Sequence, residues 1–176
     1  YMTMEYVDGL TLGSLIDGTP LSMEDSLTMA IQVANALSFV HSAGVLHRDI
    51  KPGNIMVTSN NEYKLLDFGL AAFFDRETLT RLTESGLVLG TLLYIAPEYF
   101  NDGLYDKRSE VYELAVVLYE CLTGRVHIPS QQIAGVLAYA KGMLKEDIKP
   151  PSFFNPTVTT ELDKLVMSAL EVSPDK

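Results

Sequence analysis

Residues 47–54 read HRDIKPGN, and this polar loop decides how the rest of the chain is interpreted. It combines an imidazole, a guanidinium, a carboxylate, an ammonium and an amide in a stretch broken by Pro52 and Gly53. Proline and glycine interrupt regular structure, so the stretch is predicted to be a loop and not a core strand. So many polar groups exceed what a solvent-facing turn needs, which indicates that the loop performs chemistry.

The segments on either side of the polar loop have clear patterns. Ser22 followed three positions later by Asp25 resembles a capping box, with Asp in place of the usual Glu or Gln. Apolar residues then recur at helical spacing as far as Val40, which predicts a helix over 23–42. After the loop, the strand-like residues 54–58 and 62–66 are joined by a polar turn and predict a hairpin.

The hairpin is followed by a long segment predicted to be a loop and then by a segment predicted to be a buried helix. Residues 70–95 have no sustained period, and a loop of that length in a compact domain is usually functional or disordered. Residues 109–122 are apolar around almost the whole helical wheel, which predicts a central, buried helix. The other predicted elements are a strand over 2–7 with a turn at Asp8 and Gly9, a short helix over 10–17, and helices near 131–144 and 159–170.

The composition indicates one globular domain and excludes some classes of partner. The length of 176 residues and the hydrophobic content of 47% suit a single domain with a real core. The net charge of −10 argues against a nucleic-acid-binding module, because such modules carry clustered Lys and Arg. No apolar stretch approaches the roughly 18–20 residues of a membrane span. Cys121 is the single cysteine and is predicted to be a packed, inert thiol, as expected in the reducing cytoplasm.

Further motifs follow the polar loop in a fixed order, and together they identify a family. Asp67-Phe68-Gly69 comes after the hairpin, and Gly90-Thr91 with Ala96-Pro97-Glu98 closes the long segment. Each motif is weak alone, but the order and spacing are specific. The chain thus resembles the C-terminal lobe of a eukaryotic-type Ser/Thr protein kinase, and its LLDFGLA run is similar to bacterial members of that family.

The resemblance covers residues 1–176 and implies an α+β fold that is mainly helical. A helical bundle is expected around the buried helix at 109–122, with small β-hairpins beside the active site. On this interpretation the chain holds the hinge strand and the C-lobe, whereas the N-lobe is absent and the C-terminal end is truncated. The missing N-lobe would therefore be a partner of this chain, and residues 1–176 alone are expected to be inactive.

The resemblance assigns chemical roles to the polar groups. Asp49 would accept the proton of the substrate hydroxyl, and Lys51 would place its ammonium near the transferred phosphate. Asn54 and Asp67 would supply oxygen ligands for Mg²⁺ bound to ATP. Lys51 together with Thr91 fits a Ser/Thr-specific enzyme, with Thr91 in the substrate-docking surface. The implied reaction is transfer of the γ-phosphate of ATP to Ser or Thr hydroxyls of protein substrates.

Other residues match the positions that meet the nucleotide in the family. Glu5 and Val7 correspond to hinge positions whose backbone groups contact adenine, and Met4 occupies the gatekeeper position. Met56 and Leu66 would form the apolar floor beneath the base. Ordinary core packing is an equally good explanation for the apolar members of this set.

Several residues are assigned structural or regulatory roles by the same resemblance. Arg48 beside the catalytic Asp suggests control by a phosphate on the long segment, at Thr80, Thr83 or Ser85. For any one of these three, a solvent-facing hydroxyl is the favoured interpretation. His47 is expected to pack beneath the polar loop, whereas His41 and His127 are interpreted as satisfied or solvated imidazoles. The remaining members of this group are Phe68, Gly69, Glu98 and Glu110.

The chain departs from the family pattern at a few positions. Glu110 stands where the family has Asp, and its extra methylene predicts a weakened but working anchor for the polar loop. Leu92 replaces a common Pro in the run that ends at Glu98. The family's Arg partner of Glu98 lies beyond the last residue, so Glu98 is predicted to be unpaired.

Two alternatives remain open at this point. A pseudokinase would keep the fold as a binding scaffold, and the substitution at Glu110 is the feature that favours it. A small-molecule kinase of the aminoglycoside or choline type also uses a catalytic Asp, a downstream Asn and a metal-binding Asp. The long segment that ends in Ala96-Pro97-Glu98 is a protein-substrate platform and argues against that second alternative.

Overall fold

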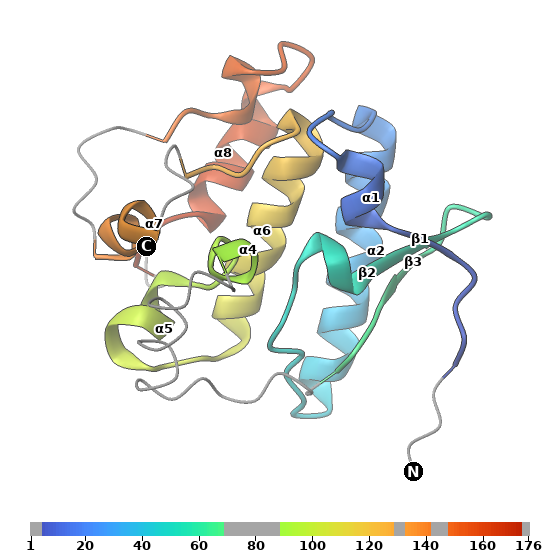
Figure 1. The fold of residues 1–176 in the computed structure, drawn as a ribbon, viewed down its shortest axis with the longest axis horizontal. Helices are drawn as coiled ribbons and strands as arrows, with labels where there is room; N and C mark the ends of the chain where they lie inside the picture. The colour runs from blue at the N-terminus through green and yellow to red at the C-terminus, as the bar shows by residue number, and fades with distance from the viewer. Residues whose placement is uncertain (1–4, 69–88, 129–132, 142–147, 174–176) are drawn as a thin grey trace.

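Two long helices form the centre of the molecule. The computed structural model describes residues 5–68, 89–128, 133–141 and 148–173. Within this part, α2 (Met23–Ser42) packs along α6 (Lys107–Thr123), and Figure 1 shows the two helices side by side. Most of the apolar core lies around α6, whose Val116, Cys121 and Leu122 are completely buried.

The boundaries of α2 follow from its caps. The Ser22 hydroxyl accepts a hydrogen bond from the Asp25 amide at 3.0 Å and donates one to the Asp25 carboxylate at 2.6 Å. These bonds satisfy part of the unpaired N-terminal turn, so the helix begins at Met23. At the other end Gly44 has a φ of +73°, a value that favours glycine and stops the helix. The prediction of a helix over 23–42 is confirmed.

Helix α6 is central and buried as predicted, but it begins before residue 109. Asp106 caps it by accepting a hydrogen bond from the Arg108 amide at 2.7 Å, and the Ser109 hydroxyl accepts one from the Asp106 amide. This capping box adds a first turn in which Lys107 and Arg108 face solvent. Gly124 ends the helix with a φ of +71°.

The sheet has three antiparallel strands in the order β1 (Gly9–Thr11), β2 (Ile55–Thr58) and β3 (Tyr63–Leu65). The predicted hairpin over 54–58 and 62–66 is confirmed with slightly shorter strands. The predicted strand over 2–7 is wrong for the described residues 5–7, which are irregular. Gly9, expected in a turn, is the first residue of β1 instead. Any Cβ there would lie 2.3 Å from the Val57 carbonyl oxygen, so the contact with β2 requires glycine.

Short helices complete the fold. The predictions over 10–17, 131–144 and 159–170 correspond to α1 (Leu12–Ile16), α7 (Ile133–Ala140) and α8 (Thr160–Ala169). Helix α5 (Pro97–Asp102) was not predicted, although Pro97 opens it and Gly103 ends it. Figure 1 places α5, α7 and α8 on one side of α6 and α1 with the sheet on the other. The described residues also form α4 (Leu89–Leu92) and the 3₁₀ turns η1 (Pro52–Asn54) and η2 (Pro151–Phe153).

This architecture confirms the predicted α+β class with a helical majority. The predicted bundle around a buried central helix is also observed, and one hairpin extended by β1 takes the place of several hairpins. Across the described ranges, no helix has both the length and the apolar character that a bilayer crossing requires.

Candidate active site

The polar loop leaves the end of α2, crosses the α6 face and enters η1 and β2. Two neighbouring side chains contact the carboxylate of Asp49. Lys51 Nζ lies 2.8 Å from Asp49 Oδ2, and Asn54 Nδ2 donates a hydrogen bond to the same oxygen at 2.6 Å. Asn54 Nδ2 also lies 2.9 Å from the Asp49 carbonyl oxygen. The Asp49 and Lys51 side chains are 22% and 25% exposed, so the group is ordered yet reachable from solvent.

Lys51 connects the polar loop to the far end of the long segment. Its ammonium donates to the Thr91 hydroxyl at 3.1 Å, although the two residues lie 40 positions apart. The structure therefore brings together Asp49, Lys51 and Thr91, which the sequence analysis had associated only by motif. A cleft of about 550 Å³ opens beside this group. Its lining includes Lys51, Thr91, Tyr94, Glu120 and Arg125.

The two residues predicted to bind a cation are brought to one place by the hairpin. The Leu66 amide donates to the Asn54 carbonyl at 2.9 Å, so the residue after Leu66, Asp67, begins next to Asn54. Asp67 is exposed and has a φ of +60°, which is uncommon for a residue other than glycine. Both hydrogen bonds described for the Asn54 side chain use its nitrogen, so its amide oxygen keeps its lone pairs for a ligand.

His47 ties the polar loop to the strand that precedes Asp67. Its Nε2 donates to the Leu66 carbonyl at 2.7 Å, and its Nδ1 accepts a hydrogen bond from the Asp49 amide at 3.3 Å. Burial lowers the pKa of His47, so the ring is neutral, as these two bonds require. The Phe68 ring packs edge-on against the imidazole with 4.6 Å between centroids.

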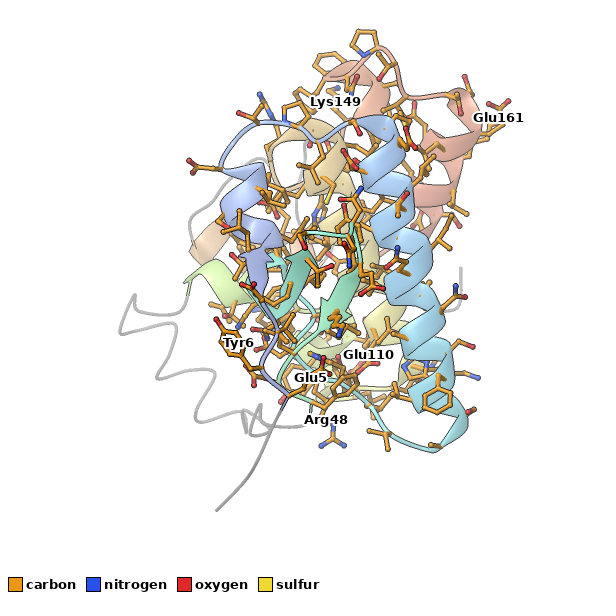
Figure 2. All side chains as sticks on the ribbon, turned by 90° about the vertical axis from the view of Figure 1, so that its right-hand side faces the viewer. Glu5, Tyr6, Arg48, Glu110, Lys149 and Glu161 are labelled. Carbon is orange, nitrogen blue, oxygen red and sulfur yellow. The ribbon has the colours of Figure 1, made fainter. Side chains whose placement is uncertain are left out.

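Glu110 anchors the polar loop despite its extra methylene. It is completely buried, and its Oε1 accepts a hydrogen bond from the Arg48 amide at 2.8 Å. Its Oε2 lies 2.5 Å from Nε2 of His41, so this histidine is satisfied by a partner that sequence analysis did not identify. Figure 2 shows Arg48 and Glu110 at the same end of the molecule. The anchor is thus present, and Arg48 and His41 hold the two oxygens of the longer side chain.

The prediction that Glu98 is unpaired is wrong. Its Oε1 accepts a hydrogen bond from the Ser109 hydroxyl at 2.5 Å. The same hydroxyl oxygen accepts a hydrogen bond from the Asp106 amide in the capping box of α6. Ser109 can do both because one oxygen carries a proton and two lone pairs. The start of α6 therefore supplies Glu98 with a hydrogen-bond donor among the described residues.

The residues predicted to meet a nucleotide lie on or beside the three-stranded sheet. Met56, on β2, pairs with Lys64 on β3 and is half-buried, as is Leu66 just after β3. Lys64 also pairs with the exposed Glu5, with 2.6 Å between Nζ and Oε1, and Val7 is half-buried in the segment before β1. The predictions for Met4, Gly69, Thr80, Thr83 and Ser85 lie outside the described residues.

Sequence reasoning missed two groups beneath the polar loop, Glu113 and Tyr105. Glu113 Oε2 accepts a hydrogen bond from the Ile50 amide at 3.2 Å and one from the Tyr105 hydroxyl at 2.9 Å. The available signal was the acidic residue Glu113, three positions after Glu110 on a helix predicted to be buried.

Comparison with known proteins places this site in a family. The family model described as "Protein kinase domain" matches residues 1–176. The chain therefore belongs to the protein kinase family, which confirms the resemblance drawn from the motifs.

Named relatives come from several bacteria. The chain is 40% identical over 176 residues to a "Probable serine/threonine-protein kinase" of Streptomyces coelicolor, covering 99% of this chain and 26% of that protein. It is 40% identical over 177 residues to the "Serine/threonine-protein kinase PknB" of Mycolicibacterium smegmatis, with coverage of 99% and 28%. A "Probable serine/threonine-protein kinase" of Clostridium perfringens is 35% identical, with coverage of 99% and 25%. The chain thus spans about a quarter of the length of the curated relatives that it matches.

Proposed function

We propose that the protein containing this chain transfers the γ-phosphate of ATP to Ser and Thr hydroxyls of protein substrates. The observation that carries the proposal is the Asp49 carboxylate held by Lys51 and Asn54 beside Thr91. The relatives' names, which specify serine/threonine kinases, support the same reaction and the same acceptor. Residues 1–176 would be the hinge and C-lobe of a kinase domain that an N-lobe completes.

Asp49 has the geometry expected of a group that orients a substrate hydroxyl and accepts its proton. Both side-chain bonds described for it fall on Oδ2, so Oδ1 can receive a hydrogen bond from the hydroxyl. Lys51 lies between Asp49 and Thr91 and would place a positive charge near the phosphate oxygens. Phosphoryl transfer depends mainly on positioning and electrostatic stabilisation, which is what these fixed groups supply.

Asn54 and Asp67 fit a magnesium ion and are proposed to hold it. They offer an amide oxygen and an exposed carboxylate, the hard oxygen ligands that Mg²⁺ prefers. The described residues contain no group of three or more His, Cys, Asp or Glu side chains suited to a metal. Two protein oxygen ligands would leave the other coordination positions of the ion to phosphate oxygens and water. Bound Mg²⁺ would neutralise charge on the phosphates.

The nucleotide is proposed to lie over the sheet. Backbone groups at Glu5 and Val7 would meet the adenine edge, and Met56 and Leu66 would support its face. Arg48 would receive a phosphate added at Thr80, Thr83 or Ser85, as a charge-assisted contact. The cytoplasm is the proposed location, because the buried thiol of Cys121 suits a compartment in which thiols stay reduced.

The test uses the full-length parent protein with ATP and Mg²⁺, and it measures phosphate transfer to the protein itself and to a basic protein substrate. Asp49→Asn is expected to lower kcat by roughly 100-fold or more, because the amide cannot accept the proton. Asp102→Asn is the matched control, since this exposed carboxylate lies at the end of α5. Absence of transfer by folded parent protein would instead favour a scaffold that retains the kinase fold.

A further inference from the structure

A second buried carboxylate lies one helical turn beyond Glu110 on α6. Glu113 is only 3% exposed and occupies the most buried helix of the fold. Residues three apart on a helix lie on the same face, so Glu110 and Glu113 both point at the polar loop. The hydrogen bonds confirm this: Glu110 accepts from the Arg48 amide and Glu113 accepts from the Ile50 amide.

Glu113 accepts hydrogen bonds from one backbone amide and one phenol hydroxyl. The Ile50 amide donates to its Oε2 at 3.2 Å, and the Tyr105 hydroxyl donates to the same oxygen at 2.9 Å. The Tyr105 oxygen also lies 3.4 Å from Oε1 of Glu110, so the phenol sits between the two carboxylates. Ile50 is 1% exposed, which means that water cannot replace the carboxyl group as the partner of its amide.

Glu113 completes the hydrogen bonding of the backbone on both sides of Asp49. The amides of Arg48, Asp49 and Ile50 donate to Glu110, His47 and Glu113 respectively. The Asp49 backbone is therefore held by a side chain before it, at it and after it. Without Glu113, Ile50 would lose the hydrogen bond that connects its backbone to α6.

Burial of the Glu113 carboxyl group costs free energy of desolvation. Burial raises the pKa of Glu113 well above its usual range, and burial also raises that of Tyr105, whose hydroxyl thus keeps the proton it donates. An apolar residue of similar size would pack on α6 without desolvation of a carboxyl group. What leucine cannot supply is an acceptor for the buried Ile50 amide.

We propose that Glu113 is a positioning residue for phosphoryl transfer, which holds Asp49 in place through the Ile50 amide. This inference rests on the proposed function, since it gives Glu113 a part in that reaction. Glu113 touches neither nucleotide nor substrate and acts only through the backbone. Its effect is therefore expected on kcat, with little effect on the KM for ATP.

The experiment compares Glu113→Gln and Glu113→Leu in the full-length parent protein. Glutamine keeps an acceptor oxygen at the same position, whereas leucine removes it and preserves an apolar core. Val117→Ala is the matched control, because Val117 is completely buried on α6 and its truncation destabilises the helix packing without removing an acceptor from the loop. For each protein, kcat, the KM for ATP, the melting temperature and amide hydrogen exchange at Ile50 are measured.

The expected result has a distinct pattern. Glu113→Leu lowers kcat by roughly tenfold to a hundredfold and leaves the KM for ATP within about twofold, since misplacement by an ångström has that effect. Glu113→Gln keeps most of the activity, and Ile50 exchanges faster in the leucine variant alone. Val117→Ala lowers the melting temperature without the fall in kcat.

Other patterns would overturn the inference. Equal losses in the glutamine and leucine variants would show that the acceptor is not what matters. A fall in kcat for Val117→Ala as large as that for Glu113→Leu would point to general destabilisation. An inactive wild-type parent would refute the proposed function itself, and Ile50 exchange would then still decide whether the anchor exists.

Discussion

His127 is a buried polar residue in an aromatic part of the core. His127 is enclosed by the rings of Tyr112, Tyr119 and Tyr139, and its Nε2 lies 2.9 Å from the Tyr112 hydroxyl oxygen. Within the described part of the chain, its Nδ1 has no hydrogen-bond partner. A proton on this ring would place a charge in an aromatic core, where few groups could stabilise it.

His127 predicts a loss of stability in acid. Burial lowers its pKa from the ordinary 6.5 to about 3, so the unfolded chain binds a proton that the folded chain does not. The stabilisation is complete above pH 6.5 and falls as the pH drops toward 3, by at most about 1.4 kcal/mol per pH unit. His127→Phe should flatten this part of the curve of melting temperature against pH. An unchanged slope between the two proteins would contradict the assignment.

Ser109 is predicted to matter for stability more than a serine in a helix usually does. Ser109→Ala removes the partner of Glu98 and one half of the capping box with Asp106. The expected cost is about 1–3 kcal/mol in the free energy of unfolding, measured with urea. Ser38→Ala, at an exposed position of α2, should change that value by less than about 0.5 kcal/mol.

At the residue scale, sequence reasoning found the groups that a linear motif contains and missed those that only folding brings together. Asp49, Lys51 and Asn54 lie in one motif, and the structure groups them. The pairing of His41 with Glu110 spans 69 positions, and no local pattern reports it. Glu98 was predicted to be unpaired because the family's arginine partner lies outside residues 1–176. The Ser109 hydroxyl, 11 positions away, donates a hydrogen bond to it instead.

At the scale of elements, the caps decided which boundaries could be predicted. Helix α2 has Ser22 and Gly44 at its ends, and the cap at Ser22 was recognised from sequence. Strand β1 was misplaced because glycine usually signals a turn, whereas Gly9 is needed for close contact with β2. The reason is tertiary, so local propensity could not supply it.

This account of β1 predicts the effect of a single methyl group. Gly9→Ala would place a Cβ 2.3 Å from the Val57 carbonyl oxygen, which forces β1 away from β2. The expected loss is about 1–3 kcal/mol in the free energy of unfolding, measured by urea denaturation. Gly90→Ala is the control, because a Cβ there meets nothing within 4 Å. Equal stability of the two variants would refute the close contact.

At the scale of the whole molecule, charge is the property most open to test. The chain carries a net charge of −10, which would attract basic substrates over distances that salt shortens. The KM for a basic peptide is expected to rise several-fold between low and physiological ionic strength in the parent protein. The same peptide with glutamine in place of its basic residues should show no such rise. Parallel behaviour of the two peptides would exclude steering by the net charge.

The bonds of His47 have a consequence for how activity is lost. One neutral imidazole joins the backbone of Asp49 to the carbonyl that precedes Asp67. The proposed proton acceptor and the proposed cation ligand are thus connected through one side chain, although 18 positions separate them in the sequence. Disturbance of that ring would displace both groups together. We therefore expect the proposed activity to be lost in one step when the His47 ring is disturbed, with few intermediate states in which one of the two groups still works.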